Sequence, residues 1–171
     1  MGATAFVPIS GPVVADTVYC EDVLVARDVA FSLPEITPTT ADLQAMGTMS
    51  MPIWQLIDNM ETAVTKIGVD LGLGKLIKPD MKPLEFRWAQ TVTDANGINK
   101  TVGCKAFIRG IPNKFGGISI GVGETPESEC TLMTTRYGLF VDGQEVVQID
   151  RLAGICRIMG TDYAKGVNAF L

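Results

Sequence analysis

The sequence contains no histidine, which excludes several kinds of catalytic and metal site. Without histidine there can be no Ser–His–Asp or Cys–His catalytic arrangement, no HExxH zinc motif and no three-histidine metal cage. Cysteine is also scarce, and no CxxC pair occurs, so a zinc ribbon and a thioredoxin-type site are excluded as well. The four cysteines are Cys20, Cys104, Cys130 and Cys156. Their wide spacing favours buried free thiols over a disulfide framework. We therefore expect no metal and no cofactor.

The chain has few charged residues, and basic residues do not outnumber acidic ones. Lys and Arg number 14 against 19 Asp and Glu, for a net charge of −5, which argues against a strongly basic nucleic-acid binder. Charged residues make up only 19% of the chain while hydrophobic residues reach 47%; soluble domains usually carry about 25% charged residues. Because interfaces between subunits are depleted in charge, this composition favours a chain that is covered by copies of itself.

Long apolar runs are missing too. No uncharged stretch reaches the ~20 residues that a membrane helix needs. The first residues lack a basic region and are interrupted by Pro8, Gly11 and Pro12, so we expect neither a membrane segment nor a signal peptide.

The 171 residues fit one domain, 1–171, with no repeat or linker to divide it. Residues 1–12 predict an extended N-terminal arm, which is either a disordered end or an arm laid on a neighbouring subunit. Residues 52–67 predict the main helix, because apolar side chains recur there at helical spacing. The stretches on either side, 36–51 and 68–83, predict long irregular loops.

Residues 84–150 predict a hairpin-rich sheet. Polar and apolar residues alternate from Leu84 to Asp94, and Asn96-Gly97 marks a tight turn before a returning strand. Asp142-Gly143 is the strongest hairpin signal, and Ile118–Val122 reads as a short strand between the two hairpins. Hairpins with one main helix predict a mainly β chain folded as an antiparallel sandwich or barrel.

No motif predicts an enzyme. Gly68–Lys75 lacks the first glycine and the final Ser or Thr of a phosphate loop, and Gly121-Val122-Gly123 has Pro126 where a dinucleotide motif needs glycine. The carboxylates of residues 124–129 lie close together in a proline-containing turn, where solvation keeps them ordinary. A third and weakest hypothesis, an enzyme that uses this acidic turn, therefore has little support.

In Arg136–Asp150, an Asp-Gly turn lies between an aromatic-rich strand and a strand that ends in Ile-Asp. With this hairpin, the second half of the chain resembles the major tail tube proteins of contractile-tailed phages and of R-type bacteriocins. Gly160-Thr161-Asp162 matches the start of the family's final helix, and Leu33-Pro34-Glu35-Ile36-Thr37 matches the end of its early strand pair more loosely.

The resemblance implies a β-barrel subunit that joins into hexameric rings, which stack as the inner tube of a contractile tail or tail-like device. The implied partners are further copies of the chain and the sheath, baseplate and tape-measure proteins, with DNA passing through the lumen without specific binding. The implied location is the virion tail, assembled in the cytoplasm of the bacterial host. The alternative from another class is a monomeric or single-ring β-barrel that binds a ligand.

Two sets of site residues follow from this interpretation. An acidic lumen would repel DNA phosphates, so we expect some of the following acids to face the lumen or its rim: Glu85, Glu124, Glu127, Glu129, Asp142 and Glu145. The long irregular stretches carry the apolar residues that we expect between subunits or rings: Leu43, Met46, Met49, Leu71, Leu73 and Leu76.

Overall fold

The computed structural model describes residues 8–171, and this part of the chain is mostly antiparallel β-structure. Strands account for 62% and helices for 7%, which confirms the prediction of a mainly β fold. The first six strands are β1 (Ile9–Cys20), β2 (Val23–Arg27), β3 (Ala30–Ser32), β4 (Pro38–Gln44), β5 (Thr48–Ile57) and β6 (Met60–Ile67). After the helix α1 (Leu71–Ile77) come β7 (Lys82–Thr93), β8 (Asn99–Phe115), β9 (Glu127–Val141), β10 (Gln144–Asp150), β11 (Ile155–Ile158), β12 (Thr161–Asp162) and the short helix α2 (Lys165–Asn168).

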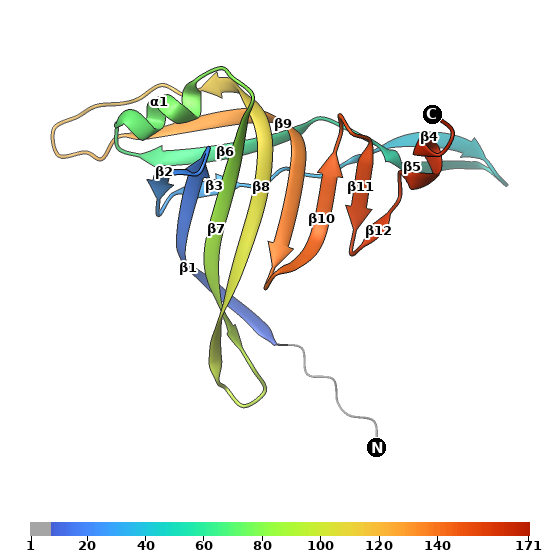
Figure 1. Ribbon diagram of the computed structural model, residues 1–171, viewed down its shortest axis with the longest axis horizontal. Helices are drawn as coiled ribbons and strands as arrows, with labels where there is room; N and C mark the ends of the chain where they lie inside the picture. Colours follow the sequence, from blue (N-terminus) through green and yellow to red (C-terminus); the bar gives the residue numbers. More distant parts are fainter. Residues whose placement is uncertain (1–7) are drawn as a thin grey trace.

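Ten of these strands form one sheet, and β9 is the strand that branches it. The main path runs β12-β11-β10-β9-β8-β7-β1-β2. Along the edge of β9 that faces away from β8, residues 127–134 pair with β6 and residues 136–141 pair with β10. The remaining pair, β4 and β5, forms a separate hairpin that extends from the body as an arm (Figure 1).

A shared bend in β8 and β9 divides the sheet into two layers. The register between these strands shifts between Arg109 and Gly110. A Cβ at Gly110 would lie 2.6 Å from the Met133 carbonyl oxygen, so only glycine allows the backbones to approach this closely. The first layer contains β1, β7, β10 and the parts of β8 and β9 that pair with them. The second layer contains β3, β6, the first half of β9 and the end of β8.

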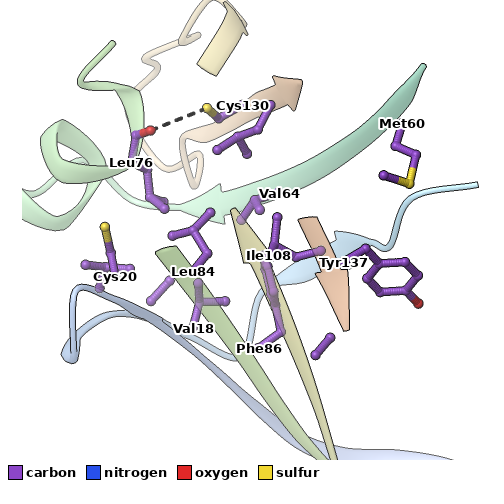
Figure 2. Close-up of a cluster of buried hydrophobic side chains, with 14 of the residues drawn as sticks. Val18, Cys20, Met60, Val64, Leu76, Leu84, Phe86, Ile108, Cys130 and Tyr137 are labelled. Carbon is purple, nitrogen blue, oxygen red and sulfur yellow. Dashed lines mark hydrogen bonds between the residues drawn. The ribbon is translucent and has the colours of Figure 1, made fainter. Parts of the chain in front are cut away.

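The core lies between the two layers. The first layer contributes Phe86 and Ile108, and the second contributes Val64 and Leu132, all of them within 2% of complete burial. Figure 2 shows side chains of both layers meeting in this cluster, with Leu76 of α1 closing one end. Every second residue is buried along β6 and along the first half of β7, as expected for strands that have one side in the core.

Both predicted hairpins are confirmed. β7 and β8 pair along their length around Gly97, and β9 and β10 pair around Asp142-Gly143, where both turn residues have positive φ. Such a turn matches the twist of the strands that it joins. The short strand expected at 118–122 is absent from the described structure, where this stretch belongs to the connection between β8 and β9.

The helix predicted over 52–67 is wrong. This segment forms most of β5 and all of β6, separated by Asp58-Asn59. The backbone N–H of Asp58 donates to the Thr37 carbonyl oxygen (2.8 Å), and its carboxylate accepts from the Thr39 hydroxyl (2.9 Å). The apolar spacing also fits two alternating strands, and β-branched residues such as Val64 favour that structure.

The two predicted loops are also more regular than expected. Residues 36–51 supply β4 and the start of β5, paired from Pro38 opposite Ile57 to Gln44 opposite Thr48. Residues 68–83 contain α1, whose first turn is capped by the Asp70 carboxylate accepting from the Leu73 N–H (3.0 Å). The predicted N-terminal arm is only partly described: residues 1–7 lie outside the described residues, and the arm's last four residues belong to β1.

Candidate functional site

The exposed side of the second layer is acidic; we call it the acidic face. The strand register places Glu61, Glu127 and Glu129 on this side. All three are exposed. The smaller residues on the same side are Ala30, Ser32, Ala63 and Thr65. Among the described residues, the strand register places one cation on this side, Lys114 at the end of β8. The result is a negatively charged surface, which also carries the exposed Ile67 and the half-buried Met133.

The structure brings together only two of the six acids that the sequence singled out. Glu127 and Glu129 lie on the acidic face, opposite Ile67 and Thr65. Glu85 lies on the exposed side of the first layer, where its carboxylate accepts from Arg87 Nε (2.6 Å). Asp142 occupies the β9–β10 turn, and Glu124 lies in the connection that precedes β9.

The sixth acid, Glu145, lies on β10 and is paired with the Arg157 guanidinium of β11. Its charge is therefore compensated within the subunit. Sequence reasoning missed Glu61, because the helix predicted over 52–67 hid its strand. The alternation of Met60, Thr62 and Val64 with polar or small residues was the signal that could have found it.

The β4–β5 hairpin forms an apolar arm. Its exposed residues include Leu43, Met49 and Met51, and Met46 at the tip is fully exposed. Asp42 is its one acidic residue and accepts from the Ser50 hydroxyl (2.5 Å). Because exposed apolar side chains gain free energy when they leave water, the arm is suited to contact with another molecule.

Four of the six apolar residues expected between subunits are exposed, and two are not. Leu43, Met46 and Met49 lie on the arm, and Leu71 is 90% exposed at the start of α1. Leu73 and Leu76 are 4% and 0% exposed, so the expectation for these two residues is corrected: they pack inside the subunit. Their helical spacing, not an interface, explains why both are apolar.

One edge of the large sheet is open. β2 covers β1 only from Thr17 to Cys20, so residues 9–15 have no strand on that side in the described structure. Ile9, Val13 and Val14 are more than half exposed there. An open edge with apolar side chains is a template for a strand of another chain.

The described residues offer no metal centre, since no group of three or more Cys, Asp or Glu side chains is arranged to hold an ion. All four cysteines are free and buried, as expected, and burial raises the pKa of each thiol. In the part of the chain that the structure covers, neither helix has the length and apolar character required to span a bilayer.

Comparison with known proteins identifies the fold and the family. No curated protein sequence matches the chain. A solved chain from the extended sheath-tube complex of the PVC extracellular contractile injection system is 16% identical, with a TM-score of 0.55 over 76% of this chain and 90% of that chain. A chain of the sheath/tube terminator of the same system is 19% identical, with a TM-score of 0.53 over 81% and 99%. A family model described as phage tail tube protein FII matches residues 15–171, so the chain belongs to this family of structural tail tube proteins.

Proposed function

We propose that the chain forms hexameric rings that stack as the inner tube of a contractile phage tail or related injection device, around a lumen through which DNA passes. The acidic face is the observation that carries this proposal beyond family membership. Glu61, Glu127 and Glu129 would repel the phosphates of passing DNA. Ala63 and Thr65, which lie between Glu61 and Ile67 on this face, are small and would offer DNA little side-chain contact.

Ring formation would use the open edge of β1. A strand from a second copy can satisfy the unpaired backbone groups of residues 9–15 and cover Ile9, Val13 and Val14. A closed ring would cover this edge in every copy, whereas head-to-tail contacts between rings allow growth along one axis.

Stacking of rings would use the apolar arm formed by β4 and β5. The β4–β5 hairpin extends beyond the body of the subunit and cannot bury Met46 against its own chain (Figure 1). Contact with the next ring would bury this tip. Sheath, baseplate and tape-measure proteins are the further partners in this proposal, and assembly takes place in the cytoplasm of the bacterial host.

The ligand-binding alternative is not favoured. The space between the layers is filled by packed side chains such as Phe86, Met60 and Ile108, and the family consists of structural tube proteins.

Negative-stain electron microscopy of the purified protein over a concentration series tests the proposal. We expect six-fold rings at low concentration and hollow tubes at high concentration. A monomer that persists at all concentrations, and also when a preformed baseplate is supplied as a nucleus, would contradict the assembly.

Charge reversal tests the role of the acidic face. Glu61→Lys, Glu127→Lys and Glu129→Lys together should leave tubes intact and reduce DNA ejection at least about tenfold, because the wall would then retain DNA. Asp80→Lys, in the turn between α1 and β7, is the control and should leave ejection unchanged. If particles built from the triple variant ejected DNA as the wild type does, the acidic face would not line the lumen.

A further inference from the structure

The exposed side of the first layer carries the opposite charge pattern; we call it the basic face. The strand register aligns Arg87 of β7 with Lys105 of β8, and Arg109 of β8 with Arg136 of β9. All four side chains are exposed. They alternate with the buried residues of the same strands, so they point away from the core and from the acidic face.

Three of these cations lack an acidic partner. Arg87 is held by Glu85, but no described carboxylate lies within ion-pair distance of Lys105, Arg109 or Arg136. With the Gln148 amide turned so that its oxygen faces Arg136, it accepts from the guanidinium at 3.0 and 3.1 Å, which fixes the direction of that side chain. Asp150 of β10 lies opposite Arg136 in the strand register, and Glu85 and, in the β1–β2 turn, Glu21 and Asp22 line the same hollow as Arg109 and Arg136.

An apolar hollow of about 560 Å³ lies beside two of these cations and also borders Asp16 of β1. Small residues, Ala15, Ala89 and Gly103, leave the space open, and the Phe107 and Phe140 rings form part of its wall. The two rings pack edge to face with centroids 5.4 Å apart, and Phe107 remains 40% exposed. Arg87 and Lys105 also line the hollow, so an apolar side chain that entered it would place its neighbours beside cations.

We propose that the basic face docks an acidic segment of the sheath subunit, with one apolar side chain of that segment filling the hollow. This inference rests on the proposed function. In a ring of two-layered subunits whose acidic face lines the lumen, the exposed side of the other layer points outward, where the sheath surrounds the tube. Carboxylates of the segment pair with Lys105, Arg109 and Arg136, which form no ion pair with the described carboxylates of the subunit.

Both parts of this surface have a defined variant. Lys105→Glu, Arg109→Glu and Arg136→Glu together reverse its charge. Gly103→Phe fills the hollow without a backbone clash, because nothing lies within 4 Å of a Cβ at Gly103 and its φ is not positive. Lys100→Glu, on the β7–β8 hairpin away from the hollow, and Gly117→Phe, where the Cβ also meets nothing, are the matched controls.

The experiment measures how much purified sheath subunit from the same particle cosediments with preformed tubes, with electron microscopy of the tubes alone. We expect the triple variant and Gly103→Phe each to form normal tubes and to lose sheath retention about tenfold or more, while both controls retain wild-type binding. Added salt should weaken wild-type retention, since exposed charges are screened over about 8 Å at 0.15 M.

Four results would overturn the inference. The first is wild-type sheath retention by both surface variants. The second is a failure of these variants to form rings or tubes although they fold, which would make the basic face a contact between copies of the chain. The third is binding of a labelled DNA duplex to the wild type that the triple variant loses, which would make the basic face a lumen wall. Wild-type tubes that retain no sheath would also reject it and leave the proposed function standing, whereas absence of tubes counts against the proposed function itself.

Discussion

Two buried lysines hold the ends of α1. Near its start, Lys66 Nζ donates to the Val25 carbonyl oxygen (2.9 Å) and lies 3.0 Å from the Asp70 carboxylate that caps the helix. At its end, Lys82 Nζ donates to the carbonyl oxygens of Lys75, Leu76 and Lys78 at 2.7, 2.9 and 2.7 Å. A cation at this end also complements the negative pole of the helix dipole. Lys82 therefore satisfies carbonyl groups that the end of a short helix leaves unpaired, whereas Lys66 joins the capping carboxylate of Asp70 to a carbonyl group of β2.

Lys82→Met should lower the free energy of unfolding by about 2 kcal/mol. The variant relieves the cost of burying an ammonium group but leaves three carbonyl oxygens without their donor. Urea denaturation of the unassembled subunit measures the change. Lys78→Met, which removes an exposed ion pair, is the control and should cost less than about 0.5 kcal/mol. Equal unfolding free energies for wild type and Lys82→Met would show that the three hydrogen bonds contribute nothing.

The buried thiols make stability depend on pH. Burial raises the pKa of all four cysteines and of Tyr137, so these groups stay protonated in the folded chain at a pH where the unfolded chain releases its protons. A raised folded pKa contributes stability that is complete below the unfolded value and is lost as the pH rises. Burial lowers the pKa of Lys82, which acts in the opposite direction but through a single group.

The subunit should therefore lose stability from about pH 8.5 upward, where unfolded thiols begin to ionise. Between pH 7.5 and pH 10 we expect the free energy of unfolding to fall by about 2 kcal/mol or more, measured by urea denaturation under reducing conditions. Replacement of all four cysteines by alanine should lower stability at pH 7.5 but flatten the alkaline slope. A wild-type slope of zero would contradict the assignment to the thiols.

At the scale of elements, the hairpins could be predicted because their signals are local. Asn96-Gly97 and Asp142-Gly143 permit the positive φ that tight turns need, and the alternation of Leu84 and Phe86 with charged residues fixed which side is buried. The prediction for residues 52–67 was wrong because the spacing of their apolar residues fits both one helix and two strands. Only pairing with β3 and β9, distant in sequence, selects the strands.

α1 was missed for the opposite reason, since its sequence contains two glycines that lower helix propensity. A Cβ at Gly72 would lie 2.5 Å from the Val25 carbonyl oxygen, so that glycine lets the helix approach β2. This contact between segments far apart in the chain is invisible to local rules. For the same reason, the sequence alone could not predict which of the six candidate acids would share a face.

The bend of β8 and β9 should be sensitive to one methyl group. Gly110→Ala places a Cβ against the Met133 backbone and should cost about 2 kcal/mol of unfolding free energy. Gly103→Ala on the same strand meets open space and is the control, with a change within about 0.5 kcal/mol. Urea denaturation compares the two. Equal stability of both variants would mean that the strands can separate at the bend without cost.

At the scale of the whole molecule, the arm is the feature that the subunit alone does not explain. Met46→Asn should leave rings intact but shorten or abolish tubes, because asparagine tolerates the φ of +51° while removing the apolar tip. Electron microscopy at matched concentration measures tube length. Met159→Asn changes another exposed methionine with positive φ and should leave tubes unchanged. Tubes of normal length from Met46→Asn would exclude the tip from stacking.

The bend at Gly110 also has a mechanical consequence. β8 and β9 each belong to both layers, so the two exposed faces of the subunit are joined by continuous backbone as well as by side-chain packing. A force applied to one face therefore reaches the other through covalent bonds, and the layers cannot slide apart while those strands are intact. A subunit built in this way can be pushed from one side and move as a single body.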